Sequence, residues 1–285
     1  MIESCTTRVS TNRFFKEVIV SQPDDGLAPY EQDSDLVRSV VASTLADLGP
    51  QISTAEESSE AACCIPVFMG QKLTSLVTFL INGVRDPGVM EIWKPVGEYE
   101  ELSLASGFFG ELDRFQNVSS FVRFEKGAGL PGQVWAKAHP VIHDNLAQHS
   151  GFLRAAGASA EALSAAIGLP IFASNFLATL VLISSDASPI AGAIEVWNRS
   201  DNCFELGTAT YATEIESKFQ LTPGSNCPFE GQILNPLEEY GRAVLVEDLS
   251  LVGPSRLDLP EQFQNTLLIP SFVDGQLQSI TSFIL

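Results

Sequence analysis

The chain lacks the residues that nucleic-acid-binding and membrane-spanning proteins need. Its 285 residues hold 16 Lys and Arg against 35 Asp and Glu, which gives a formal net charge of −19. Such an acidic chain repels phosphate backbones and anionic lipid headgroups, so we expect neither nucleic acid nor a membrane as partner. The apolar runs, such as Leu76 to Ile81, are far shorter than the ~20 residues of a membrane-spanning helix.

Cysteine is also scarce. The chain has five cysteines, without a CxxC motif, without paired His and Cys spacing and without a signal-peptide segment. We therefore expect a cytoplasmic, reduced protein with no metal site. Cys63 and Cys64 are adjacent at the start of an apolar strand, where thiols behave as small hydrophobic groups. A redox-active pair at these two positions is the alternative.

What the chain does contain is repetition. A hairpin that opens with a proline-containing strand occurs three times, and a Glu-x-Trp strand occurs twice in step with it, at Glu91-Ile92-Trp93 and Glu195-Val196-Trp197. The three hairpin strands begin at Ile65-Pro66-Val67-Phe68, Leu169-Pro170-Ile171-Phe172 and Ile269-Pro270-Ser271-Phe272. The hairpin prolines at 66, 170 and 270 set a repeat period of roughly 100 residues. A repeat of this length is long enough to bury a core of its own, so it predicts tandem domains.

The patterns between the hairpins predict an α+β fold. Turn residues separate the strands, and each hairpin with the following Glu-x-Trp hairpin is predicted to form a four-stranded antiparallel meander. Apolar spacing predicts a helix over 35–48, capped by Ser34 or Asp33. Further helices are predicted over 106–116, 152–166 and 208–219.

The order of these parts allows two divisions of the chain. We prefer an N-terminal half-repeat over 1–85, made of the helix 35–48 and the hairpin 65–81, followed by domains over 86–187 and 188–285. Complete units over about 1–118 and 119–218 are the alternative. In either division a half-repeat is left over, and we expect it to pair with a full domain or with a second chain, because exposed sheet edges and apolar faces are unfavourable.

The segment Arg123-Phe124-Glu125-Lys126-Gly127-Ala128-Gly129-Leu130-Pro131-Gly132-Gln133-Val134-Trp135, then Pro140-Val141-Ile142-His143-Asp144 and Gly168-Leu169-Pro170-Ile171-Phe172, resembles the GAF domain family. Residues 188–285 are similar to a degenerate copy. The resemblance implies a GAF/PAS-like fold: a central antiparallel sheet with helices, and a small-molecule pocket roofed by 129–166. It suggests as ligand-binding residues Arg123, Trp135, His143, Asp144, Phe152 and Arg154.

The chain departs from several GAF subtypes. It has no N-K-x-F-x-x-x-D-E run, which argues against a cyclic nucleotide, and no cysteine before the covering helix, which argues against a covalent bilin. The cysteines of the GAF-type methionine sulfoxide reductases are missing from 86–187 as well. The resemblance therefore names no cofactor and no ligand.

Single residues in these motifs allow alternative interpretations. Gly127-Ala128-Gly129-Leu130-Pro131-Gly132 matches the dinucleotide fingerprint G-x-G-x-x-G, but the parallel strand-helix-strand unit that this fingerprint requires is missing, so we expect a structural turn. Trp93 and Trp197 are predicted to pack in the sheet, with Glu91 and Glu195 in solvent. Arg154 is either a ligand residue or a partner in a surface salt bridge.

These observations predict a non-enzymatic sensory or regulatory protein that binds a small molecule through the pocket of 86–187. The alternative is a structural dimerisation or protein-interaction module without a ligand. An enzyme that uses Cys63 or Cys64 is the third hypothesis. We expect the partner to be a second copy of the chain in a homodimer or a separate signalling protein.

Overall fold

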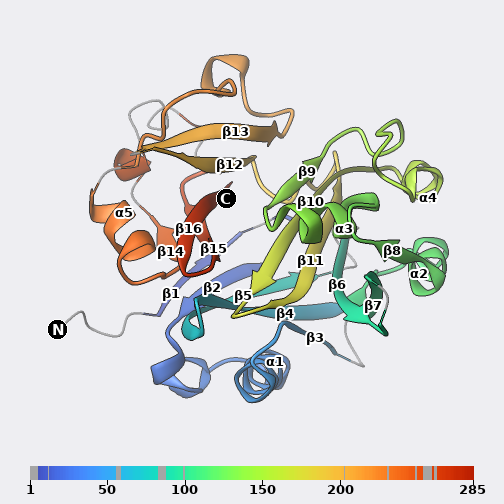
Figure 1. Cartoon of the computed structure of the whole chain (residues 1–285), viewed down its shortest axis with the longest axis horizontal. Coiled ribbons are helices and arrows are strands. Elements are labelled where there is room, and N and C mark those ends of the chain that lie inside the picture. Colours follow the sequence, from blue (N-terminus) through green and yellow to red (C-terminus); the bar gives the residue numbers. More distant parts are fainter. Residues whose placement is uncertain are drawn as a thin grey trace.

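Three antiparallel sheets make up the fold of the computed structural model (Figure 1). We call each sheet with its helices a unit: unit one spans residues 7–82, unit two 88–185 and unit three 193–285. The structure describes residues 6–11, 13–55, 59–82, 88–98, 100–201, 203–229, 231–247, 249–252, 259 and 262–285. No helix within these ranges is long and apolar enough to span a membrane.

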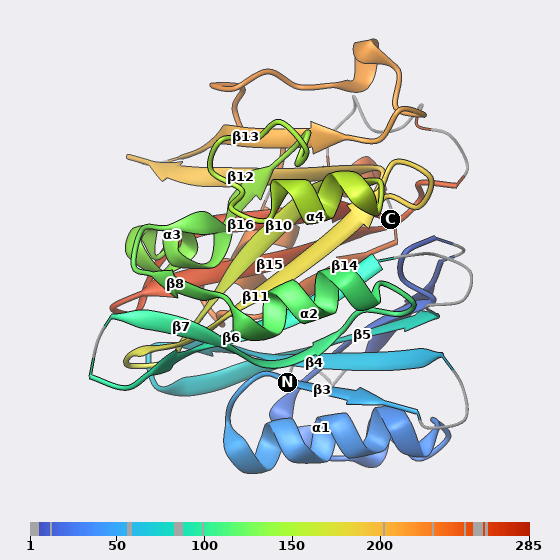
Figure 2. The ribbon, with the colours of Figure 1, turned by 90° about the vertical axis from the view of Figure 1, so that its right-hand side faces the viewer.

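Unit one has the strand order β1-β2-β5-β4-β3. Helix α1 (Asp35–Asp47) lies outside this sheet, below it in Figure 2. The hairpin β4-β5 was predicted, whereas β1 and β2 were not. These two strands complete the half-repeat predicted for 1–85, because β2 pairs with β5 and gives unit one a sheet of its own. The strands are β1 (Thr7–Ser10), β2 (Glu17–Ser21), β3 (Gln51–Thr54), β4 (Glu60–Met69) and β5 (Lys72–Asn82).

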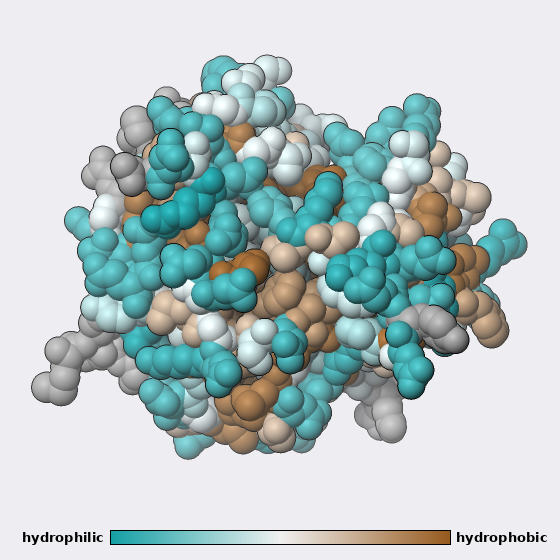
Figure 3. All heavy atoms as spheres, viewed as in Figure 1, coloured by the Kyte–Doolittle hydropathy of each residue, from teal (hydrophilic) through white to brown (hydrophobic). Residues whose placement is uncertain are grey.

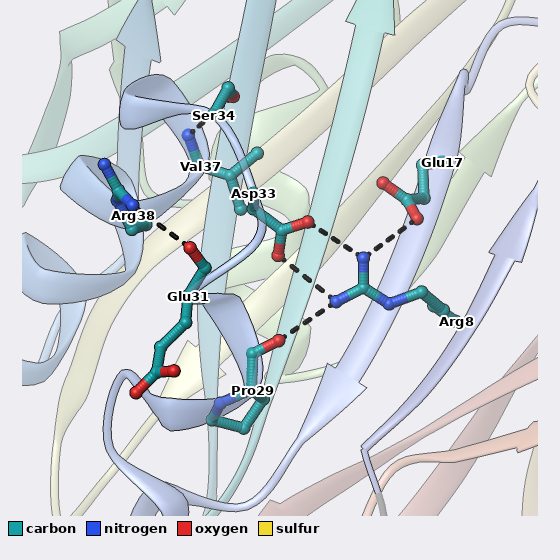
Figure 4. Close-up of polar contacts among 8 residues, drawn as sticks. All are labelled: Arg8, Glu17, Pro29, Glu31, Asp33, Ser34, Val37 and Arg38. Atoms are coloured by element: carbon teal, nitrogen blue, oxygen red, sulfur yellow. Dashed lines mark hydrogen bonds and ion pairs between the residues drawn. The ribbon is translucent and has the colours of Figure 1, made fainter.

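Polar contacts hold the β1-β2 hairpin to the loop before α1 (Figure 4). The guanidinium of Arg8 donates to Asp33 at 2.9 Å and to the carbonyl of Pro29 at 3.1 Å, and it pairs with Glu17 on β2 at 3.4 Å. The Oγ of Ser34 accepts the Val37 N–H at 3.4 Å, which confirms Ser34 as the cap of α1.

Unit two has the order β8-β7-β6-β11-β10-β9. Its Glu-x-Trp strand β6 pairs with β11, about 90 residues later in the chain, and not with the preceding hairpin. The predicted meander is therefore wrong, because each Glu-x-Trp hairpin joins the proline hairpin that follows it. The elements are β6 (Gly88–Val96), β7 (Glu101–Phe108), α2 (Asp113–Phe121), β8 (Arg123–Glu125), α3 (Gly129–Lys137), β9 (Val141–His143), α4 (Ala155–Ala160), β10 (Leu163–Phe172) and β11 (Phe176–Ser185).

Unit three repeats this pairing with the order β13-β12-β16-β15-β14. The sheets thus follow the division at 86 and 188, and the division into domains stays a prediction. The elements are β12 (Ala193–Ser200), β13 (Cys203–Tyr211), α5 (Gly231–Glu238), β14 (Val244–Val246), β15 (Thr266–Val273) and β16 (Gln276–Ile284). Short 3-10 turns lie at Pro23–Asp25, Ala28–Tyr30, Ser217–Phe219 and Leu249–Val252.

Three predicted helices differ from the structure. Strand β7 continues through Phe108 before α2 begins at Asp113, and β13 continues through Tyr211 where a helix over 208–219 was expected. The helix predicted over 152–166 is reduced to α4, because Ala166 and its neighbours pair with β11 in the sheet. In all three places sheet pairing prevails over local helix propensity.

The three units form a closed ring around one shared core. The proline strands β4, β10 and β15 contact one another at its centre. At the periphery, β3 contacts β7, β9 contacts β13, and β14 contacts β1. Figure 1 shows α1, α2 with α4, and α5 on the outside of this arrangement, and Figure 3 shows apolar side chains in the middle of the same face.

Successive residues of each proline strand point to opposite faces of the sheet, and this alternation explains the architecture. Cys63, Ile65 and Val67 of β4 belong to the shared core, whereas Ala62 and Cys64 belong to a separate core under α1. The residues of β10 and β15 likewise alternate between the shared core and a separate core of their own unit. Because both faces of each sheet are covered, the strands read as almost continuous apolar runs.

Candidate functional site

The region where the resemblance places a ligand holds a buried ion pair. Arg154, just before α4, pairs with Glu91 of β6 through its two terminal guanidinium nitrogens, Nη1 and Nη2, the Nη2 to Oε2 distance being 2.8 Å. The side chains of Arg154 and Glu91 are 1% and 0% exposed. Arg154 also donates to the Ser119 hydroxyl of α2, and Trp93 donates its Nε1–H to Glu91 at 2.9 Å.

Four aromatic rings surround the same guanidinium. Its central carbon lies 4.6 Å from the ring centre of Phe115, and the other three rings lie between 5.3 and 5.7 Å away. These other three are Trp93, Phe124 and Phe152. A cation enclosed by aromatic faces is the arrangement that proteins use for cationic ligands. Here the chain supplies its own cation, and the space is occupied.

This pair corrects two expectations. Glu91 is not solvated, because it shares a sheet face with Trp93, and α2 and α4 cover that face. Arg154 does form a salt bridge, but in the interior and not at the surface. Sequence reasoning missed Glu91 as a partner, although its repeated position beside Trp was the available signal. The expectation that Trp93 and Trp197 pack in the sheet is confirmed, since both are fully buried.

Unit three contains a related arrangement. Glu195 is buried like Glu91, and the hydroxyl of Tyr211 donates to it at 3.0 Å. The expectation that Glu195 is in solvent is therefore wrong for the same reason: helix and loop segments cover this face of the sheet.

The other predicted ligand residues do not gather around one cavity. Phe152 is buried beside Arg154, but Arg123 and Asp144 are exposed. Trp135 of α3 is half-buried and stacks on Phe176 with ring centres 5.3 Å apart. Their assignment as a site stays a prediction, and only the buried members contact one another.

His143 forms a second polar cluster in unit two. Its ring stacks on His149 with centres 3.8 Å apart, and its Nε2 lies 3.3 Å from Gln133 Oε1. Burial, and then the nearby His149 and Lys137, lower the pKa of His143 to about 4. His143 is therefore a neutral imidazole at pH 7. Within the described part of the chain, no group of three His, Cys, Asp or Glu side chains is placed to hold a metal ion.

The paired cysteines lie on opposite faces of β4, both fully buried. Burial raises the pKa of Cys64 to about 11 and that of Cys63 well above its ordinary value. Since the thiolate is the nucleophilic form, this environment disfavours the hypothesis of an enzyme that uses these thiols.

The glycine motif of unit two forms a turn. The N–H of Gly127 donates to the carbonyl of Gly132 at 2.8 Å, and a Cβ at position 132 would lie 2.1 Å from the Glu125 carbonyl oxygen. Gly129 has a φ of 60°. The glycines are thus required by the backbone geometry of the entry to α3, as a structural turn requires.

Two cavities lie at the boundaries between units. One, of about 440 Å³, is bordered by Asp144, the start of β10 and Thr210 of unit three. The other, of about 500 Å³, is lined by unit one, unit three and the segment that joins units two and three, including Arg13, Gln262 and Ser188. No sequence motif marks these residues, because each unit contributes only a few of them.

Comparison with known proteins gives no family assignment. No family model matches the chain, and no curated protein matches it either. Solved structures that it is similar to include the GAF domain of A. aeolicus nlh2 in an inactive state, at 25% identity and a TM-score of 0.28. They also include free methionine-R-sulfoxide reductase from Neisseria meningitidis, at 21% identity and a TM-score of 0.27.

A mutated NreA protein from Staphylococcus aureus matches at 16% identity and a TM-score of 0.30. These matches cover 34%, 34% and 36% of the chain and, in the same order, 57%, 51% and 77% of the other structures. The chain thus spans little more than half the length of the first two. With TM-scores this low, the solved structures do not place the chain in a family: it is similar, over about a third of its length, to structures that include GAF domains.

Proposed function

We propose that the chain is a non-enzymatic regulatory protein that binds a small molecule between its units, and that the pocket of unit two is closed by Arg154. The observation that carries this proposal is the ion pair of Arg154 with Glu91 inside four aromatic rings. A ligand inside unit two would have to displace a paired, fully buried guanidinium, which is strongly unfavourable. Two cavities bordered by described residues, of about 440 and 500 Å³, lie at the boundaries of the units.

The test uses Trp93 as a reporter of the closed pocket. In a variant with Trp135→Phe and Trp197→Phe, Trp93 is the remaining tryptophan. Small soluble metabolites are first screened for those that raise the Tm of the unmodified protein. We expect such a compound to leave the emission of Trp93 unchanged, because Trp93 bonds to Glu91 inside unit two and lines neither of the cavities between units.

Two results would contradict the proposal. A stabilising compound that shifts Trp93 emission, and whose affinity changes more than tenfold in Arg154→Ala, would place the ligand inside unit two. A screen in which no compound raises the Tm would remove the support for ligand binding.

The second candidate is a ligand-free interaction module. Helix α2 carries exposed Val118 and Phe121, which lie three residues apart and so on one side of the helix. Because these side chains are uncharged, two copies that met through them would place no like charges of these residues in direct contact, although each chain has a net charge of −19. Native mass spectrometry tests this: a dimer that Phe121→Ser converts to a monomer supports the candidate, and a monomer at all concentrations contradicts it.

A further inference from the structure

A polar cavity of about 500 Å³ lies between unit one, unit three and the segment that joins units two and three. Unit one contributes Thr11 and Arg13 from the β1-β2 connection, and the segment after β11 contributes Ser188. Unit three contributes Gln262 and Asn265 from the segment before β15. The volume falls within the range of roughly 300–1,000 Å³ that small-molecule sites occupy.

One wall of this cavity is fixed by packing and charge. The guanidinium of Arg13 lies 4.2 Å from the ring centre of Phe263, which is fully buried. The same guanidinium pairs with Glu214 at 3.2 Å. A cation that stacks on a buried ring and pairs with a carboxylate has a defined position, so this wall is formed before any ligand arrives.

The charge of the wall is also compensated. Because Arg13 is paired with Glu214, it offers an anion little net attraction, and the net charge of −19 repels anions further. Most of the other lining residues carry hydroxyl or amide groups, beside the apolar Ala187, Pro189 and Leu285, so the lining does not favour a wholly apolar ligand. The chemistry therefore selects a neutral molecule with many hydrogen-bonding groups.

Ser188 adds a specific observation. It is only 4% exposed, and its Oγ has no hydrogen-bond partner in the described part of the protein. A buried hydroxyl without a partner is unfavourable. Ser188 lines the cavity while its Oγ is closed off from solvent, so rotation of this side chain towards the cavity would let the hydroxyl pair with a hydroxyl group of a ligand.

We propose that this cavity binds a small neutral polyhydroxylated molecule, a sugar or a polyol. The inference rests on the proposed function in one respect, that the protein binds a small molecule between its units. It adds the site and the chemical class of the ligand.

The experiment measures binding to the full chain by ligand-observed saturation-transfer NMR with calorimetric titration. The neutral probes are D-glucose, maltose and myo-inositol; citrate and spermidine serve as charged probes. We expect saturable binding of at least one neutral probe and none of either charged probe. Saturability matters because sugars also stabilise proteins by exclusion from the surface, without binding.

Two variants locate the site. Ala187→Trp fills the cavity from an exposed position in its lining and should weaken binding more than tenfold. Ala156→Trp, at an exposed position on α4 away from the cavity lining, is the matched control and should leave binding unchanged. Gln262→Leu, at an exposed position, keeps the cavity open but removes an amide, and should weaken binding if Ala187→Trp does not fold.

The inference is overturned by equal affinity in Ala187→Trp and the control, by saturable binding of citrate or spermidine, or by no saturable binding of any neutral probe. If metabolites of another class raise the Tm while no neutral probe binds, the proposed function stands and this inference fails. If no metabolite raises the Tm and no neutral probe binds, both the proposed function and this inference fail.

Discussion

At the scale of single residues, the interior of unit two depends on a charge pair that does not reach water. Glu91 accepts hydrogen bonds from Arg154 and from Trp93, and the Ser119 hydroxyl donates a hydrogen bond to the Phe115 carbonyl at 2.8 Å. Each hydrogen bond in this series fixes the orientation of the side chains that it joins. Removing one charge of such a pair leaves the other buried and uncompensated, which costs more than the pair contributes.

We therefore expect Arg154→Ala to lower the free energy of unfolding by about 3–5 kcal/mol. The double variant Arg154→Met with Glu91→Gln should lose less, because no unpaired charge remains. Urea denaturation measures both. Arg114→Ala, at an exposed position on α2, is the control and should change stability by less than about 0.5 kcal/mol. A loss in Arg154→Ala no larger than the control would contradict a stabilising role.

His143 should make stability depend on pH. Its pKa of about 4 in the folded protein lies below the ordinary value of about 6.5, so folding favours the neutral ring. This contribution is complete above pH 6.5 and is lost as the pH falls towards 4. We expect the Tm to fall between pH 7 and pH 5, and His143→Gln to reduce that slope. An unchanged slope in the variant would show that other groups cause it.

At the scale of elements, the entry to α3 depends on the glycine turn. A methyl group at position 132 would meet the backbone carbonyl of Glu125, which no side-chain rotation relieves. We expect Gly132→Ala to lower the free energy of unfolding by about 1–3 kcal/mol, the usual cost of overpacking. In Gly49→Ala, the nearest atom would be 3.8 Å away, so this control should be nearly neutral. Circular dichroism during urea unfolding compares the two.

At the scale of the whole molecule, the shared core joins the three units into one packed body. Ile65, Leu169 and Ile269 come from different sheets but belong to the same apolar cluster. A unit separated from the others would expose this face to water, and an isolated sheet face of this kind is unstable.

We therefore expect unfolding in a single transition. Trp93 reports on unit two and Trp197 on unit three, so variants that keep one tryptophan each can follow the two units separately. Their thermal midpoints should coincide within error. Midpoints several degrees apart would show that the units unfold independently.

Sequence patterns predicted the repeated parts of this fold better than their connections. The proline hairpins were predicted because their sequence pattern recurs along the chain, and the cap at Ser34 because a serine directly precedes the helix. Both signals lie within a short segment of sequence. The strand β2 was missed because its pairing partner β5 lies about 60 residues away, and no local signal specifies such a contact. The pocket residues were sought on the roof segment alone, whereas the partner of Arg154 is a strand residue 63 positions earlier.

The ring of three units is formed within one polypeptide, through the contacts of β3 with β7, of β9 with β13 and of β14 with β1. Peptide linkage holds each unit near its neighbours at an effective concentration on the order of millimolar, so contacts too weak to assemble separate subunits are sufficient here. A single unit can then carry substitutions that would dissociate a trimer of separate subunits. Unit two has the glycine turn motif and the sequence of unit three does not, a difference between units that such tethering permits.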